Sequence, residues 1–376
     1  MDKKKKLKID PVLLAAWLLA AVSAFFVHPD KDYLSYIDFR SLGILWSLMV
    51  IIQGLKENSV FERIAEKLLA KVKGFRQLVL VLVFLCFFSA MLITNDVALI
   101  TFVPFSIMIL INCSKKDAII PVVVLQTVAA NLGSMLTPIG NPQNLYLYGL
   151  TAMSFVEFVS CMLPYTLMAA ALLIASVMIM KKDDVAVLAG DDFHIVKHFG
   201  SRIQVIIYAV LFVIAILSVL RVIPWQVMSI IVFVIVLGMD LKILLRADYV
   251  LLLTFIGFFI FTGNMGRIPQ IHDLLMSTVS GHEFVISVLL SQFISNVPAT
   301  LMLSGFSENY KELLAGVNVG GLGTLIASMA SLISYKAYAS MQEKNVPRYI
   351  FVFTVVNLLF LALLCILHLF IFAPIQ

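Results

Sequence analysis

Residues 92–144 read LITNDVALITFVPFSIMILINCSKKDAIIPVVVLQTVAANLGSMLTPIGNPQN, and this stretch decides the predicted fold. Two polar clusters interrupt its apolar background: residues 94–96, which are Thr-Asn-Asp, and the Gly-, Pro- and Asn-rich segment 131–144. A carboxylate such as Asp96 is costly inside a bilayer, and intramembrane carboxylates usually mark functional sites. We therefore interpret Asp96 and its polar neighbours as part of a functional site.

The composition of the whole chain is that of a membrane protein. Of its 376 residues, 61% are hydrophobic and 13% are charged, against about 25% charged residues in soluble domains. The net charge of +5 comes from basic residues scattered in short loops, which argues against a nucleic-acid partner. The four cysteines have no C-x-x-C spacing, so neither a disulfide framework nor a metal site is predicted from them. We expect an all-α polytopic protein embedded in the lipid bilayer.

Hydrophobic run length separates helices that cross the bilayer from helices that turn back within it. A span needs about 20 residues, with about 17 as a practical minimum. Nine runs are close to or above this length: residues 11–27, 39–55, 119–150, 154–180, 203–219, 223–238, 249–263, 313–336 and 348–372. Two pairs of shorter runs flank polar residues, and we predict them to be re-entrant helical hairpins over 77–111 and 283–306. Their polar tips require surrounding protein or a water-filled cavity.

The distribution of Lys and Arg predicts the orientation in the membrane. Loops on the side of the N-terminus hold 22 of the 27 Lys and Arg residues, and loops on the other side hold 5. Because cytoplasmic loops are enriched in basic residues, we expect a cytoplasmic N-terminus and an external C-terminus in a cell (inner) membrane. Residues 56–74 have apolar side chains on one helical face and Lys and Glu opposite, which predicts an interfacial amphipathic helix. That face consists of Val60, Ile64, Leu68, Leu69 and Val72.

The chain contains an internal repeat. At an offset of 201 residues, Ile93-Thr94-Asn95 matches Ile294-Ser295-Asn296. At an offset of 187 residues, six residues of the segment 131–148 are identical to their counterparts: Asn131, Gly133, Thr137, Ile139, Leu145 and Tyr148 match Asn318, Gly320, Thr324, Ile326, Leu332 and Tyr335.

We therefore predict an N-terminal repeat over 1–180, a cytoplasmic linker with a connecting helix over 181–222, and a C-terminal repeat over 223–376. The single extra span 203–219 inverts the second repeat relative to the first, which is the architecture of secondary transporters.

Each repeat is predicted to contain a broken transmembrane helix. Residues 119–150 are too many for one straight span, and the segment holds Gly133, Pro138, Gly140 and Pro142, which weaken or interrupt a helix. Residues 313–336 are interrupted by Gly320-Gly321-Leu322-Gly323. Helix ends exposed by such breaks present carbonyl groups to cations and N–H groups to anions.

The hairpin tips and the breaks together give the candidate site. Their hard oxygen ligands suit a small cation such as Na⁺, assigned to Asn95, Asp96 and Asn296, and leave polar groups for an anionic solute. We expect Tyr146 and Tyr148 to belong to an aromatic belt instead. The candidate residues for solute and ion binding are Thr94, Asn95, Asp96, Asn131, Gly133, Thr137, Gly140, Asn141, Pro142, Asn144, Ser295, Asn296, Val297, Asn318, Gly320, Thr324 and Ser328.

These segments resemble the ion transporter superfamily over nearly the whole chain. The similar parts are ITNDVALITFVP, NLGSMLTPIGNPQNLYLYG and ISNVPATLML. Divalent anion/sodium symporters, citrate carriers, arsenite permeases and one class of sodium–proton antiporters belong to this superfamily. The resemblance implies a homodimer, an elevator-like movement, and a site formed by both tips with both broken helices. Asn95-Asp96 is similar to the arsenite-permease and antiporter branches, whereas Gly140-Asn141-Pro142-Gln143-Asn144 is similar to the anion carriers.

Two functions follow as expectations. The first is an ion-coupled permease for small anions of the citrate or dicarboxylate type, without a cofactor, driven by Na⁺ or H⁺ through Asp96. The alternative is arsenite efflux or sodium–proton exchange, in which Asp96 is the exchanging carboxylate. We expect no enzyme, because Asp96 is the only carboxylate that the sequence places deep in the membrane.

Overall fold

The computed structural model describes residues 10–180 and 200–372, and these residues form helices joined by loops, without a strand. The first half contains α1 (Pro11–Phe26), α2 (Tyr33–Tyr36), α3 (Phe39–Glu57), α4 (Val60–Leu69), α5 (Phe75–Ile93), α6 (Asn95–Asn112), α7 (Ile119–Ser134), α8 (Pro142–Leu150) and α9 (Phe155–Met178). The second half contains α10 (Arg202–Val219), α11 (Trp225–Met239), α12 (Leu241–Leu245), α13 (Tyr249–Gly266), α14 (Pro269–Val279), α15 (Glu283–Ile294), α16 (Asn296–Leu303), α17 (Tyr310–Val319), α18 (Met329–Ala339) and α19 (Val346–Phe372).

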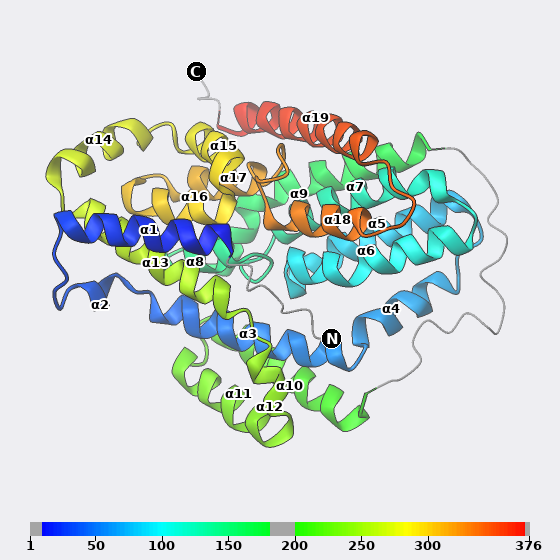
Figure 1. The fold of residues 1–376 in the computed structure, drawn as a ribbon, viewed down its shortest axis with the longest axis horizontal. Helices are drawn as coiled ribbons and strands as arrows, with labels where there is room; N and C mark the ends of the chain where they lie inside the picture. The colour runs from blue at the N-terminus through cyan, green and yellow to red at the C-terminus, as the bar shows by residue number, and fades with distance from the viewer. Residues whose placement is uncertain (1–9, 181–199, 373–376) are drawn as a thin grey trace, which may run out of the picture.

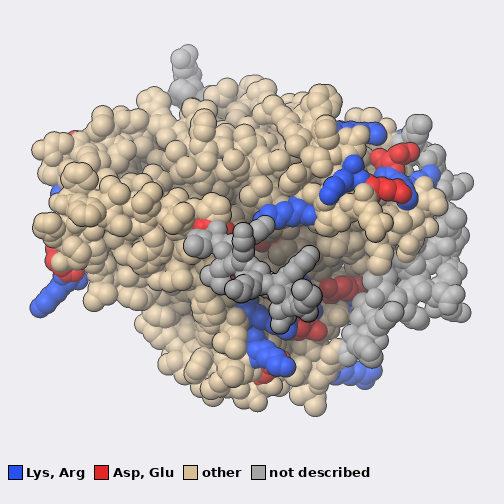
Figure 2. All heavy atoms as spheres, viewed as in Figure 1, with Lys and Arg blue, Asp and Glu red and all other residues tan. Residues whose placement is uncertain are grey.

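Helix length and apolarity confirm the polytopic all-α class. In the described part, eight segments are long and apolar enough to cross a membrane: α3, α5, α6, α7 with its preceding turn, α9, α10, α13 and α19. Large apolar side chains are exposed on the outer helices, as for Phe25 (78%), Ile206 (63%) and Phe351 (69%). Figure 2 shows one face that is mostly uncharged, with Lys, Arg, Asp and Glu confined to a few clusters. Such a surface is unfavourable in water and suits lipid.

Two helical hairpins enter the molecule from opposite ends, with α5 and α6 on the right of Figure 1 and α15 and α16 on the left. Thr94 joins α5 to α6 with φ 72° and ψ 150°, and Ser295 joins α15 to α16 with φ 77° and ψ 153°. The two tips thus have nearly the same backbone conformation, which lies in a φ/ψ region that residues other than glycine seldom adopt.

The arms of the two hairpins differ in length. Helix α16 has 8 residues, which span about 12 Å and cannot cross a bilayer. Helices α5 and α6 have 19 and 18 residues, more than the predicted apolar runs. Length alone therefore does not identify the first hairpin, because each arm could span the membrane. Its tip contacts the break between α7 and α8, where the Asn95 backbone N–H donates to the Gly140 carbonyl at 3.2 Å.

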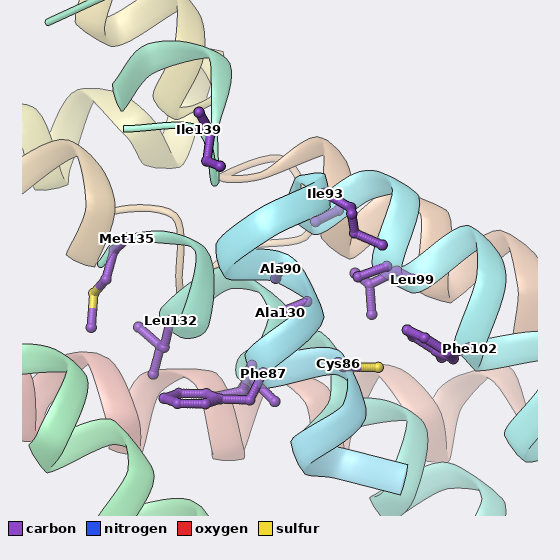
Figure 3. Close-up of a cluster of buried hydrophobic side chains, with 14 of the residues drawn as sticks. Cys86, Phe87, Ala90, Ile93, Leu99, Phe102, Ala130, Leu132, Met135 and Ile139 are labelled. Atoms are coloured by element: carbon purple, nitrogen blue, oxygen red, sulfur yellow. The ribbon is translucent and has the colours of Figure 1, made fainter. Parts of the chain in front are cut away.

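Helix α7 forms the centre of the first half. Its span is 83% buried, against 22% for α19, and it packs along α5, α6 and α18. Figure 3 shows Cys86, Phe87 and Ala90 of α5 beside Ala130 and Leu132 of α7. A Cβ atom at Gly133 would lie 2.1 Å from the Phe87 carbonyl oxygen, so glycine is what permits this close helix approach. Small residues serve this purpose between membrane helices, where packing replaces the hydrophobic effect.

The amphipathic helix differs in part from its prediction. Helix α4 covers Val60–Leu69 only, because α3 continues to Glu57. The residues of α4 that are buried are Phe61, Ala65 and Leu69, whereas Ile64 and Leu68 are about half exposed. The packed stripe is therefore displaced by one residue from the predicted face.

The order of the helices along the chain is similar in the two halves, but α1 and α11, with 16 and 15 residues, are not among the eight described segments long enough to cross a membrane. Helix α10 is the predicted connecting helix, and residues 181–199 of the predicted linker lie outside the described residues. The division into two inverted repeats stays a prediction.

Candidate functional site

Both hairpin tips and both helix breaks border one cavity of about 330 Å³. The tip residues Asn95 and Asp96 come from the first half, and Ser295 and Asn296 come from the second. The volume suits a small solute. The predicted site residues that line this cavity are Asn95, Asp96, Asn141, Pro142, Ser295, Asn296, Val297 and Ser328.

A larger hollow of about 640 Å³ lies at the loop between α18 and α19 and is lined by exposed charged residues such as Lys116 and Glu343. Figure 2 shows charged side chains gathered over that loop. We assign the candidate site to the smaller cavity, because buried polar side chains from both halves border it.

The two tips are held by matching hydrogen bonds. The Asn95 N–H donates to the Gly140 carbonyl at 3.2 Å, and the Asn296 N–H donates to the Ala327 carbonyl at 2.9 Å. Asn95 and Asn296 are 201 residues apart, and Gly140 and Ala327 are 187 apart. These bonds therefore join positions that the sequence repeat pairs.

A second pair of bonds follows the same offsets. The Thr137 hydroxyl donates to the Met91 carbonyl at 2.5 Å, and the Thr324 hydroxyl donates to the Gln292 carbonyl at 2.9 Å. Neither threonine lines the cavity. In the structure the side chain of each threonine bonds the helix break to the neighbouring hairpin and does not face the predicted site.

Asparagine side chains connect the first tip to the second break. The Asn95 Oδ1 accepts from the Asp96 N–H at 2.9 Å, which leaves the Asn95 Nδ2 to donate to the Asn131 Oδ1 at 3.1 Å. The Ser328 hydroxyl donates to the same Asn131 oxygen at 2.9 Å. Asn131 therefore acts behind the cavity wall, where it positions one residue from each half.

A similar bond joins the two breaks directly. The Asn318 Nδ2 donates to the Asn144 Oδ1 at 2.7 Å. The Asn144 Nδ2 in turn donates to the carbonyls of Ser134 and Thr137 at 3.2 and 3.3 Å. Asn144 and Asn318 thus hold the breaks together and do not line the cavity.

The remaining predicted residues shape the backbone. Cβ atoms at Gly140 and Gly320 would lie 2.0 and 2.8 Å from the carbonyl oxygens of Ser134 and Gly316. Like Gly133, they permit close packing and lie outside the cavity wall. Thr94 borders a separate hollow of about 30 Å³.

Helix N-termini converge on the cavity. Asn95, Pro142, Asn296 and Met329 are the first residues of α6, α8, α16 and α18, and all four line it. Each helix N-terminus carries roughly half a positive charge. The site is therefore suited to negative charge on a solute or on nearby side chains.

The structure adds two carboxylates that sequence reasoning missed. Asp10 and Asp248 line the cavity and are the N-caps of α1 and α13, where their Oδ1 atoms accept from the N–H groups of Val12 and Leu251 at 2.8 and 3.0 Å. An Asp directly before an apolar helical run is an N-cap signal. What the sequence does not indicate is that these two helix ends meet the hairpin tips.

The sequence did not predict a buried carboxylate outside the cavity; that Asp96 is the only carboxylate deep in the membrane stays a prediction. Glu283, at the start of α15, is 1% exposed, and its Oε1 accepts from the Asn309 N–H at 3.0 Å. It does not line the cavity. A helix start in the sequence does not reveal this burial, which arises because Gly316 of α17 lies against Phe284, next to Glu283 in α15.

The assignment of Tyr146 and Tyr148 to an aromatic belt is also wrong. The two side chains are 7% and 3% exposed, because α8 is packed against α3, α16 and α17. The Tyr146 hydroxyl lies 3.0 Å from the Ser304 Oγ, and the Arg221 guanidinium lies 5.0 Å from the centre of the Tyr148 ring. Both tyrosines therefore face protein and not the lipid surface.

The predicted sodium ligands differ in what they can offer. The Asp96 Oδ1 is buried and has no hydrogen-bond partner among the described residues. The Asn95 Oδ1 already accepts from the Asp96 N–H, and the Asn296 Oδ1 lies 3.5 Å from the Ser295 Oγ. Among His, Cys, Asp and Glu of the described chain, no group of three or more could hold a metal ion. Asp96 is thus the predicted ligand best placed to take a cation or a proton.

Known proteins similar to this chain include membrane proteins and proteins named as transporters. Residues 4–309 match a family model described as citrate transporter. An uncharacterized transporter of Methanocaldococcus jannaschii is 33% identical over 306 residues, covering 80% of this chain and 81% of its own length. An inner membrane protein of Escherichia coli is 26% identical over 84% of both chains. A silicon efflux transporter of Oryza sativa is 31% identical over 153 residues, covering 40% of this chain and 31% of its own length.

Proposed function

Because the chain belongs to the citrate transporter family, we propose that it couples the transport of a small anion, of the citrate or dicarboxylate type, to Na⁺ or H⁺. The observation that carries this proposal is the single cavity bordered by both hairpin tips, both helix breaks and Asp96. Discontinuous helices that meet in this way form the substrate and ion sites of secondary transporters.

The cavity offers separate places for the two charges. The N-termini of α8, α16 and α18 carry no acidic residue in their first turns, so their dipoles favour an anionic group. Asp96 lies in the first turn of α6 and supplies the carboxylate for the coupling cation. Partial charges from helix ends would hold an anion here, because the described residues of the wall include no Lys, Arg or His.

The movement and the assembly belong to the same proposal. The hairpins and broken helices would move together against α1, α3, α10, α11 and α13, in an elevator-like cycle within a homodimer. The N-terminus would lie in the cytoplasm and the C-terminus outside, which is supported by the uneven distribution of Lys and Arg.

A specific observation favours a second candidate function. The described cavity wall contains three carboxylates, Asp10, Asp96 and Asp248, and no Lys, Arg or His. This wall also suits efflux of an uncharged oxyacid such as arsenous acid, or sodium–proton exchange, with Asp96 as the exchanging carboxylate. The local similarity to a silicon efflux transporter supports this candidate.

Transport by purified protein in proteoliposomes separates the two functions. The first predicts uptake of labelled citrate or succinate that depends on an imposed Na⁺ or H⁺ gradient. The second predicts dissipation of a pH gradient on addition of Na⁺ or arsenite, without dicarboxylate uptake. Empty liposomes provide the baseline for both measurements.

The two-tip site makes a matched prediction for Asn95 and Asn296. Each substitution, Asn95→Ala and Asn296→Ala, is expected to weaken solute or ion binding by about tenfold or more, because each removes polar groups from the same cavity. Asn95→Ala also removes the bond to Asn131 and should lower the melting temperature more. Binding titrations and thermal melts of both variants measure these effects. A binding defect in only one of the two would contradict a shared site.

A further inference from the structure

Gln143 is the second residue of α8 and lines the cavity beside Asn141 and Pro142. Its side chain is 1% exposed. Neither its Oε1 nor its Nε2 has a hydrogen-bond partner among the described residues. Buried side-chain amides are nearly always bonded, so a fully unpaired amide in a cavity wall points to a ligand that completes its bonds.

The fold itself does not require a polar side chain at this position. The adjacent Asn144 has its amide occupied by bonds to the backbone and to Asn318. At the offset of 187 residues, Gln143 corresponds to Ala330, which lies in the first turn of α18 and has no side-chain polar group. The second break therefore forms with a methyl group where the first carries an amide.

Asn141 presents an unpaired acceptor next to Gln143. The Ser134 hydroxyl donates to the Asn131 carbonyl at 2.8 Å, so its oxygen is left to accept from the Asn141 Nδ2 at 2.7 Å. This fixes the orientation of the Asn141 amide. The Asn141 Oδ1 has no partner in the described structure. It is consequently an acceptor that is available to a hydrogen-bond donor of the solute.

Among the fully buried polar atoms of the described wall residues, the unpaired ones are mostly acceptors. They are the Oε1 of Gln143, the Oδ1 of Asn141 and the Oδ1 of Asp96, with the Nε2 of Gln143 as a donor. A fully ionised carboxylate only accepts hydrogen bonds. It can therefore pair with the Gln143 Nε2 but not with the acceptor oxygens of Gln143 and Asn141. A hydroxyl group both donates and accepts, so it can accept from the Gln143 Nε2 and donate to one of the two acceptor oxygens, the Gln143 Oε1 or the Asn141 Oδ1.

We propose that Gln143, with Asn141, is a specificity-determining residue that recognises a hydroxyl group on the transported solute. The substrate class is then a small acid bearing an X–OH group, which is either a hydroxycarboxylate or a protonated oxyacid. This inference rests on the proposed function, since it places the solute in the cavity assigned there.

Equilibrium binding to the purified full-length protein tests the inference, with probes that differ by one hydroxyl. Malate is compared with succinate, citrate with propane-1,2,3-tricarboxylate, and arsenous acid represents a protonated oxyacid. The wild type is expected to prefer the hydroxylated member of at least one pair, or to bind arsenous acid, by about tenfold or more over the probes that lack the group. A preference within the carboxylate pairs identifies a hydroxycarboxylate, and binding of arsenous acid alone identifies an oxyacid.

The variants Gln143→Leu and Gln143→Met remove the amide while they keep a side chain of similar size. Both are expected to reduce the hydroxyl preference to less than about twofold. Gln53→Leu, on α3 and outside the cavity wall, is the matched control and keeps the preference. Without solute, the Gln143 variants should melt at or above the wild-type temperature, since the lost amide has no bonds. Asn144→Leu, which loses several bonds, should melt lower.

Three results would overturn the inference: equal or tighter binding of the probes without a hydroxyl, a preference that survives both Gln143 variants, or no binding of any hydroxylated probe. Because binding is measured without an ion gradient, its outcome is distinguishable from a failure of coupling. Hydroxyl-selective binding without gradient-driven transport would remove the proposed coupling and leave the role of Gln143 intact.

Discussion

Asp96→Asn is expected to reduce gradient-driven transport by about 100-fold while solute binding at equilibrium persists. The substitution keeps the size of the side chain and removes its charge. Asp96 borders the cavity, and its Oδ1 is buried without a partner among the described residues. A cation or proton that binds there gains a charge-assisted interaction, which is stronger than a neutral one and whose loss costs about 1.5–3 kcal/mol, or about 10- to 150-fold.

Transport into proteoliposomes under imposed Na⁺ and pH gradients measures this effect, with solute binding measured on the same preparation. Asp240→Asn is the control, because Asp240 caps α12 away from the cavity and asparagine caps a helix equally well. Unchanged coupled flux in Asp96→Asn would contradict the coupling role of Asp96 and would indicate that Asp248 or Asp10 has this role. Asp248→Asn then tests charge alone, since it also preserves the helix cap.

The helices and the second hairpin could be predicted from the sequence, because the membrane constrains the length and the polarity of the segments within it. A polar pair that divides an apolar run into two short pieces, such as Ser295-Asn296, favours a hairpin, and a following helix of eight residues cannot cross. The first hairpin was less certain from length, and its arms are indeed long enough to span. Its identification depends on a tertiary contact, the Asn95 bond to Gly140, which no local pattern reveals.

The candidate site was predictable where it depends on the repeat. Residues at paired positions, such as Asn95 with Asn296 and Asn141 with Ser328, do line one cavity. Sequence reasoning did not separate wall residues from those that hold the wall in place, such as Asn131, because both are polar residues near a break. It also missed Asp10 and Asp248, whose role depends on how α1 and α13 pack against the hairpins.

Burial of polar and aromatic residues is the other property that local sequence did not determine. Tyr146 was expected in an aromatic belt at the membrane interface, but the helices packed around α8 bury it. Gln143 follows a proline at a helix start, where an exposed side chain would be ordinary. Its function can be inferred only from the pairing of its two amide atoms with the rest of the structure.

Gly140→Ala is expected to destabilise the protein by at least about 3 kcal/mol and to abolish transport. An added Cβ would lie 2.0 Å from the Ser134 carbonyl oxygen and 2.7 Å from the carbonyl carbon. Both are backbone atoms at a packed helix end, so they cannot rotate away, and overpacking of this severity lies at the upper end of measured costs. The displaced Gly140 carbonyl would also release the Asn95 N–H, so the first tip would lose its contact with the break.

Ala327→Gly is the matched control, because Ala327 holds the second tip through the same type of bond and its methyl group is fully buried. Removing that methyl group should cost only about 1 kcal/mol, from lost packing and added backbone freedom, and should preserve transport. Thermal melts in detergent and transport in proteoliposomes measure both variants. A Gly140→Ala protein as stable and active as Ala327→Gly would mean that the first break has room for a side chain. In that case the contact between the first tip and the break would not be required to form the site.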